Sequence, residues 1–214
     1  MDQFDLQWMG IKIAAVVVIL LHIVPIMVWV ERRGSAFMQN RSGPNRVGPL
    51  GLLQSLADVI KFIFKEDVVP GHVEKFFYLL APCVLLIPAF MLFAVIPFGG
   101  EITIGERVLS MQISDLDVGI LYIFSIASLG VYGIIMASWA SNNKYSMLGG
   151  LRSTSQMISY ELSLGLGAIG MMMIAGSVNL REIVHVQNDL LFGFLPAWGV
   201  FTQPLGFWIF LVSS

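Results

Sequence analysis

Four long runs of this sequence carry almost no charge, and each is long enough to cross a membrane as a helix. They cover residues 11–30, 76–98, 118–140 and 157–178. The hydrocarbon core of a bilayer is crossed by roughly 20 apolar residues in helical conformation. Only 12% of the residues are charged, which is about half the fraction usual in a soluble domain. The sequence therefore predicts an all-α fold, a polytopic transmembrane helical bundle that forms a single membrane domain over residues 1–214.

A fifth apolar run begins at Pro204 and is still apolar at Ser214. A run this short does not cross a bilayer at about 1.5 Å of rise per helical residue. We therefore expect an incomplete fifth span, in a chain that is truncated at its C-terminal end relative to an intact protein.

The net charge and the cysteine content limit the kinds of partner and site that this chain can have. The formal net charge is −2, and neither this charge nor any basic tract favours nucleic acid as a partner. The single cysteine, Cys83, has no companion Cys or His at the spacing of a metal site. We expect no metal site in this chain, and the lipid bilayer is its first expected partner.

The basic residues are distributed unevenly between the predicted loops. Nine of the 12 Lys and Arg residues fall within 31–75 and 141–156. The other three are Lys12, Arg107 and Arg181. Because cytoplasmic loops retain positive charge, this pattern places 31–75 and 141–156 in the cytoplasm and the N-terminus outside, on the periplasmic side of a bacterial inner membrane.

A separate amphipathic helix is predicted over residues 51–65. Its polar residues recur at helical spacing on one narrow stripe: Gln54, Asp58, Lys61 and Lys65. Leucine and isoleucine cover the other side, so we expect the helix to lie in the membrane interface. Two Gly-Pro units precede it, at 43–44 and 48–49, and they interrupt helix and strand alike. A helix that only anchors the chain to the surface is a second interpretation.

Two motifs on the predicted cytoplasmic side resemble those of a known family. The first comprises ERR at 31–33, RSGPN at 41–45, VGP at 47–49, GLLQ at 51–54, AD at 57–58 and Lys61. The second comprises ASN at 140–142, LGGLR at 148–152 and QMISYEL at 156–162. Together they are similar to the two signatures of a membrane subunit of respiratory complex I, the one called subunit 1 or, in its bacterial form, the H subunit.

The resemblance implies a subunit that joins the hydrophilic arm of the enzyme to its proton-pumping membrane arm. With peripheral subunits, it would form a narrow chamber that admits a quinone, ubiquinone or menaquinone, from the lipid. FMN and iron–sulfur clusters would lie on partner subunits, and small membrane subunits would be further partners. We expect no independent activity from this chain, which would act as one subunit of an NADH:quinone oxidoreductase.

The resemblance also implies which residues border the quinone chamber. They come from the end of the first span, the Gly-Pro segment and the amphipathic helix: Glu31, Arg32, Arg41, Asn45, Gln54, Asp58 and Lys61. Without the resemblance, a charge cluster at a helix end and a polar stripe are typical of an ordinary solvated surface. Both interpretations stay open from the sequence alone.

Glu161 is the one charged residue between 157 and 178. A charged carboxylate at mid-membrane costs about 2.5–3.5 kcal/mol on insertion scales, and less near a helix end. Since Glu161 lies near the cytoplasmic end of the predicted span, it could simply reach the interface. The resemblance of SYEL at 159–162 to the family motif favours a proton-relay or coupling carboxylate instead.

Two alternative functions remain at this stage. The related membrane subunit of an energy-converting hydrogenase or formate hydrogenlyase would share ancestry but serve proton reduction rather than quinone reduction. A non-enzymatic helical transporter or anchor would use the amphipathic helix for adhesion only. Co-purification with a large flavin and iron–sulfur assembly would separate the last alternative from the others.

Overall fold

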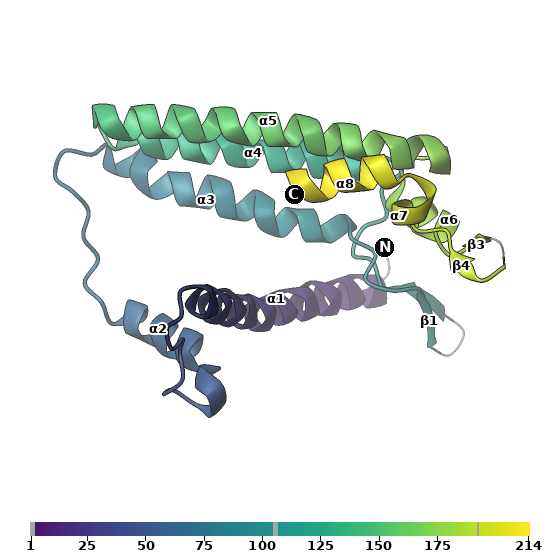
Figure 1. Ribbon diagram of the computed structural model, residues 1–214, viewed down its shortest axis with the longest axis horizontal. Coiled ribbons are helices and arrows are strands. Elements are labelled where there is room, and N and C mark those ends of the chain that lie inside the picture. The colour runs from purple at the N-terminus through teal and green to yellow at the C-terminus, as the bar shows by residue number, and fades with distance from the viewer. Residues whose placement is uncertain (1–2, 105–106, 192) are drawn as a thin grey trace. The chain divides into compact units, whose positions relative to one another are not determined.

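The computed structural model describes residues 3–104, 107–191 and 193–214, and it is predominantly helical (Figure 1). Among these residues, four helices are long and apolar enough to cross a membrane. The other elements are short helices and two short two-stranded hairpins. The predicted all-α, polytopic fold class is therefore confirmed.

Contacts divide the chain into two compact units, residues 1–68 and 69–214, where the sequence predicts a single membrane domain. The division falls in the stretch between 64 and 74, which contains no helix or strand. Each unit is described by itself.

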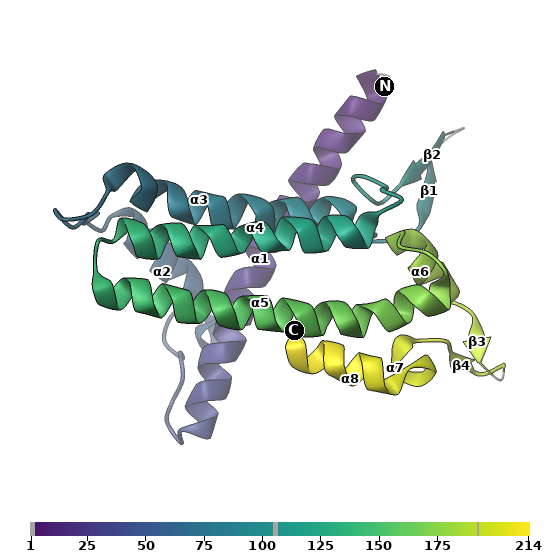
Figure 2. The same cartoon turned by 90° about the horizontal axis from the view of Figure 1, so that it is seen from above.

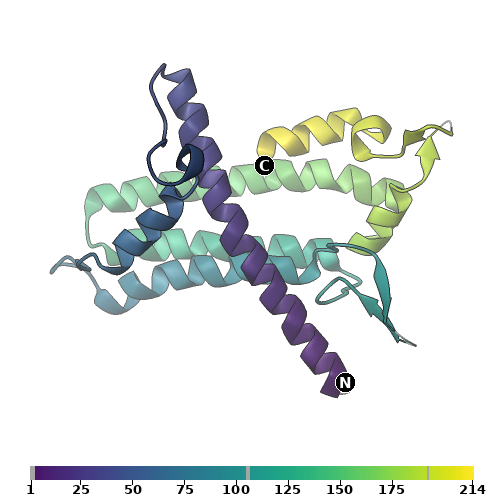
Figure 3. The same ribbon diagram turned by 90° about the horizontal axis from the view of Figure 1, so that it is seen from below.

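The first unit consists of one long helix and a short segment that folds back along it. Helix α1 runs over Gln3–Met38, the 3-10 turn η1 over Pro49–Gly51, and helix α2 over Gln54–Ile63. In Figure 3 the chain leaves the end of α1, turns back and reaches α2 beside the same helix. α1 thus continues past Val30 through the charged residues of the first motif, because a break in hydropathy ends the apolar run without ending the helix.

The second unit is built on three long helices in a row. They are α3 over Lys75–Met91, α4 over Gly119–Ala140 and α5 over Lys144–Ala175, with α4 packed against both of the others (Figure 2). The short helix α8, Pro204–Ser213, packs on α5. α4 matches the predicted span 118–140 within one residue, whereas α3 ends seven residues before the end of the predicted span 76–98 and α5 ends three residues before the end of the predicted span 157–178.

Smaller elements connect these helices. A 3-10 turn, η2, follows α3 over Leu92–Val95. Strands β1, Glu101–Ile104, and β2, Arg107–Ser110, form an antiparallel hairpin between α3 and α4. Between α5 and α8 come α6 (Leu180–Val186), strands β3 (Leu190–Leu191) and β4 (Leu195–Pro196), and α7 (Gly199–Thr202).

Helix α5 begins well before the predicted span at residue 157, so much of the second motif is helical rather than a loop. Asn143 caps its start, because the side-chain oxygen accepts a hydrogen bond from the Tyr145 amide at 2.9 Å. No proline lies between this cap and Gly176, whose left-handed backbone ends the helix. Polar residues after Lys144 therefore continue the helix without interruption.

Glycines allow the long helices of the second unit to approach closely. A Cβ atom added to Gly133 of α4 would lie 3.0 Å from the Ala81 carbonyl oxygen and 3.1 Å from the Leu85 Cβ of α3. A Cβ at Gly167 of α5 would lie 3.0 Å from the Phe210 amide nitrogen of α8. Small residues at such crossings are typical of membrane helix packing.

Candidate functional site

The predicted site residues of the first unit gather where the returning segment meets the second half of α1. Four turns of α1 contribute to this contact through Pro25, Trp29, Arg32 and Ala36, whose spacing places them on one side of the helix. The hydroxyl of the buried Ser55 of α2 donates a hydrogen bond to the Pro25 carbonyl oxygen at 3.0 Å. This bond attaches the start of α2 to the middle of α1.

An ion pair joins the two helices. Arg32 of α1 and Asp58 of α2 lie 2.5 Å apart, guanidinium nitrogen to carboxylate oxygen. Gln54, one turn earlier in α2, donates a second hydrogen bond to the same carboxylate at 3.1 Å. The hydrogen bonds from Arg32 and Gln54 hold the pKa of Asp58 below its ordinary value, and the charges of Arg32 and Lys61 act in the same direction.

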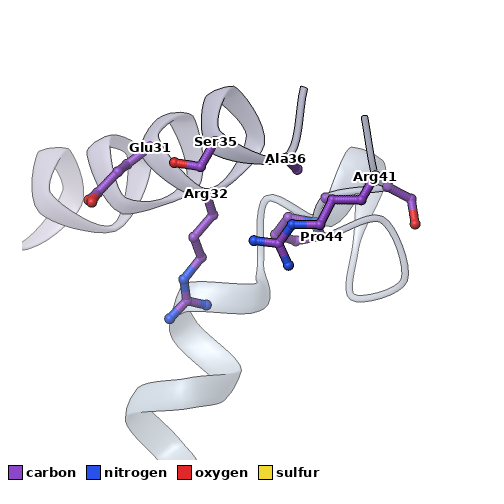
Figure 4. A pocket seen from close by; sticks show the side chains of 8 residues that line it. Glu31, Arg32, Ser35, Ala36, Arg41 and Pro44 are labelled. Carbon is purple, nitrogen blue, oxygen red and sulfur yellow. The ribbon is translucent and has the colours of Figure 1, made fainter. Parts of the chain in front are cut away.

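A pocket of about 420 Å³ lies next to this ion pair, between the end of α1 and the loop that follows it (Figure 4). Its lining residues come from α1 and from the first Gly-Pro unit: Glu31, Arg32, Ser35, Ala36, Arg41, Ser42, Gly43 and Pro44. Figure 4 shows Arg32 extending from α1 towards α2 and Arg41 lying along the loop beside Pro44.

The loop wall of the pocket depends on two close approaches. Gly43 packs against α1, since a Cβ there would lie 3.3 Å from both the Ala36 Cβ and the Arg33 Cα. Gly51 packs beneath Pro44, because a Cβ there would lie 2.2 Å from the Pro44 carbonyl oxygen. Gly51 also has a positive φ of 76°, which favours glycine. These contacts give the Gly-Pro segment a defined conformation, in which it forms one wall of the pocket.

The structure brings most of the predicted chamber residues together. Glu31, Arg32 and Arg41 line the pocket, and Asp58 connects Arg32 with Gln54. Lys61 lies in the last turn of α2. Asn45 is exposed and follows the pocket residue Pro44.

Sequence reasoning missed other residues of this site. Ser35, Ala36 and Ser42 line the pocket without having been singled out. Ser35 and Ala36 could have been found by continuing the helical periodicity of α1 past the ERR motif. Ser42, which lies in the loop, gave no signal beyond its place in that motif.

Glu161 belongs to the second unit and lies on α5, where it is half-buried. Because α5 starts at Lys144, Glu161 is near the middle of the helix rather than near its end. Serines at four-residue intervals run along part of α5. Ser155, Ser159 and Ser163 each donate a hydroxyl hydrogen bond to the carbonyl four residues earlier.

A second polar cluster lies at the end of this unit where α4 starts and α5 has ended. Asn179 caps α6 and donates a hydrogen bond to Asp115 at 3.1 Å. Arg181 lies 3.2 Å from Glu101 and 3.7 Å from Asp115. These bonds attach the β1–β2 hairpin and the start of α6 to one another, which is a structural role.

The chemistry of the site is that of a polar pocket lined by hydrogen-bond donors and acceptors. Within the described ranges, no group of three or more His, Cys, Asp or Glu side chains is arranged to hold a metal ion. The guanidinium groups of Arg32 and Arg41 offer hydrogen-bond donors, whereas the carboxylates of Glu31 and Asp58 accept. Such a pocket can bind a ligand with carbonyl or anionic oxygens.

Comparison with known proteins identifies relatives along almost the whole chain. The family model described as NADH dehydrogenase matches residues 11–214. The second NADH-quinone oxidoreductase H subunit of Geobacter sulfurreducens is 44% identical over 209 residues, which cover 98% of this chain and 61% of that protein. The second H subunit of Koribacter versatilis is 46% identical over 216 residues, covering 95% of this chain and 60% of the relative.

The NADH-quinone oxidoreductase H subunit of Bdellovibrio bacteriovorus is 42% identical over 233 aligned residues, covering 100% of this chain and 60% of its own length. The chain thus spans about three fifths of the length of the curated relatives it matches.

Proposed function

The chain belongs to the NADH dehydrogenase family, and from this premise we propose that it is a membrane subunit of a proton-translocating NADH:quinone oxidoreductase. In this proposal, residues 1–68 form part of the quinone chamber, and the second unit helps couple quinone reduction to proton pumping. The names of its relatives support this over a hydrogenase or formate hydrogenlyase subunit. Family membership also argues against a general transporter or anchor.

The observation that carries the proposal is the pocket beside the Arg32–Asp58 ion pair. A quinone needs a few hydrogen-bond donors for its carbonyl oxygens and apolar surface for its ring and tail. Arg32 and Arg41 provide donors in the pocket. Leu52, Leu53 and Leu56, in and just before α2, are exposed apolar side chains available for the tail.

The rest of the assembly follows from the same proposal. FMN and the iron–sulfur clusters reside on partner subunits, which deliver electrons to the quinone. The chain lies in a bacterial inner membrane with its N-terminus on the periplasmic side. The basic residues of 31–75 and 141–156 support this orientation.

The pocket is tested by filling it in the intact subunit, assembled in its complex in membrane vesicles. Ser35→Trp places a large ring among the lining residues, and we expect NADH-driven quinone reduction to fall about ten-fold or more because the ligand is excluded. NADH oxidation with a water-soluble artificial acceptor should be unchanged, since it does not require the pocket.

Gly34→Trp is the matched control. Gly34 is the neighbouring residue of α1, it does not line the pocket, and a Cβ there meets nothing within 4 Å. Equal quinone reductase activities in the Ser35→Trp and Gly34→Trp complexes would contradict the chamber role of this pocket.

We propose in addition that Glu161 relays protons between the chamber and the pumping subunits. A charged carboxylate in a membrane-spanning segment is costly, so such residues are rare and usually functional. Glu161→Gln keeps the shape and removes the exchangeable proton, so proton pumping and coupled quinone reduction should fall while assembly is preserved. Glu182→Gln, an exposed residue of α6, is the control. Unchanged pumping in Glu161→Gln would remove the relay role.

A further inference from the structure

Leu50 has a backbone conformation that a leucine rarely adopts. Its φ of 55° and ψ of 17° lie in the left-handed region, within the 3-10 turn η1. The neighbouring residues Gly48 and Gly51 also have positive φ, but both are glycines, for which this conformation carries no steric cost. A non-glycine residue remains there only when its surroundings hold it.

Two side chains of α1 hold Leu50 in place. The Trp29 indole N–H and the Arg33 guanidinium each donate a hydrogen bond to the Leu50 carbonyl oxygen, both at 3.0 Å. One carbonyl can accept both bonds because it has two lone pairs. The Arg33 guanidinium carbon also lies 5.2 Å from the centre of the Trp29 ring, within range of a cation–π interaction.

The sequence spacing makes this arrangement possible. Trp29 and Arg33 are four residues apart, so they are neighbours on the surface of α1. Arg32, next in the chain to Arg33, extends to Asp58. Two consecutive arginines therefore make different contacts. Arg32 pairs with α2, and Arg33 binds the turn that precedes α2.

The turn that contains Leu50 contacts the loop wall of the pocket through Gly51. Gly51 follows Leu50 and lies directly beneath the Pro44 carbonyl oxygen, with no room for a Cβ between them. Pro44 is part of the loop wall of the pocket, and Ser35 and Ala36 are part of the α1 wall. Fixing Leu50 to α1 therefore helps to set the separation of the two walls, together with the packing of Gly43 against α1.

We propose that Trp29 and Arg33 are positioning residues that set the width of the pocket by locking Leu50 onto α1. The inference rests on the proposed function, in which the ligand of this pocket is a quinone. Neither residue lines the pocket, so both act through the turn and not by touching the ligand. Their effect is expected in quinone affinity rather than in the rate of the chemical step.

The test uses the intact subunit assembled in its complex, with a quinone added to membrane vesicles. Trp29→Phe removes the indole donor and keeps a ring, and Arg33→Gln removes the cation and shortens the reach. From the typical worth of one hydrogen bond, we expect each to raise the KM for quinone about five-fold, with kcat within about two-fold of wild type. Arg33→Lys retains a charged donor and should largely restore the wild-type KM.

Arg46→Gln and Trp208→Phe are matched controls that remove an exposed arginine and an exposed tryptophan outside this contact. An unchanged quinone KM in both Trp29→Phe and Arg33→Gln, or equal KM values in Arg33→Gln and Arg33→Lys, would overturn the positioning role. If the Arg33→Gln subunit does not assemble into its complex, the quinone KM of the Trp29→Phe complex alone decides the test.

The Ser35→Trp complex separates failure of this inference from failure of the proposed function. If Ser35→Trp blocks quinone reduction while the Trp29 and Arg33 variants behave as wild type, the pocket binds quinone and the positioning role is wrong. If Ser35→Trp has no effect either, the assignment of the pocket itself is wrong, and the positioning role falls with it.

Discussion

Different kinds of contact stabilise the interior of each of the two units. In residues 1–68, side chains of α1 reach backbone carbonyls and a carboxylate on the returning segment, as Trp29, Arg33 and Arg32 do. In residues 69–214, helix backbones touch where glycines leave room, as at Gly133 and Gly167. The first kind of contact is directional and can exchange with water, whereas the second tolerates almost no change in volume.

The largest effect is expected where a glycine of α4 packs against the backbone of α3. Gly133→Val adds three carbon atoms at a position where the Cβ alone would lie 3.0 Å from a backbone oxygen of α3. We expect it to destabilise the packing of α3 on α4 by about 3 kcal/mol, the upper range for overpacking. The amount of assembled subunit in membranes and its thermal stability in detergent measure this loss.

Gly130→Val, one turn earlier on the same helix, is the control. A Cβ at Gly130 meets nothing within 4 Å, so both variants share the change in helix propensity but only one has the clash. Equal stability of the two variants would show that glycine packing does not hold α3 and α4 together.

The corresponding change in the first unit creates a closer clash but a smaller expected loss of overall stability, because the clash lies in a mostly exposed loop that can move away from it. Gly51→Ala forces an alanine into a left-handed conformation, which costs about 1–2 kcal/mol, and its Cβ would displace Pro44. We expect the loop over residues 41–53 to detach from α1 and become a site of proteolysis, while the second unit stays intact.

Limited proteolysis of the assembled complex, followed by mass spectrometry, measures this change. Gly71→Ala provides the reference, since a Cβ there meets nothing within 4 Å. Cleavage of 41–53 at the same rate in both variants would mean that Gly51 does not support the loop.

The smallest effect concerns the ion pair and its dependence on pH. Hydrogen bonds from Arg32 and Gln54 hold the pKa of Asp58 below 3.8. The charged carboxylate therefore stabilises the docking of α2 at every pH above 3.8, and this contribution is lost as the pH falls through the lower pKa of the folded state. Around neutral pH this contribution is fully present, so the titration of Asp58 should cause no variation of stability with pH.

Carbon NMR of labelled aspartate in detergent, followed as a function of pH, measures the midpoint directly. Arg32→Gln should move the Asp58 midpoint up towards 3.8, because the first cause of the shift is removed. Arg46→Gln should leave it unchanged. An Asp58 midpoint that is the same in wild type and Arg32→Gln would contradict the pairing of these two side chains.

Hydropathy alone predicted the helical, membrane-spanning class of this fold, because long uncharged runs allow few other structures. It did not predict that α1 continues to Met38 or that α5 begins at Lys144. Hydropathy measures preference for lipid, while the end of a helix depends on caps and on proline or glycine. Asn143 and Gly176 mark both ends of α5 in the sequence.

The candidate site was predicted in part. The motifs singled out Glu31, Arg32, Arg41 and Asp58, and the structure brings them to one pocket and its adjoining ion pair. The contact of Trp29 and Arg33 with Leu50 was beyond sequence reasoning. It depends on a positive φ at a leucine, and no residue pattern predicts that conformation.

The length of α5 has a mechanical consequence. At about 1.5 Å per residue, its 32 residues form a rod of about 48 Å, longer than the roughly 30 Å hydrocarbon layer that it would cross. Part of it must lean or project beyond the acyl chains. No proline interrupts the helix between Lys144 and Ala175, so a change in tilt at its Lys144 end would also displace the Glu161 carboxylate.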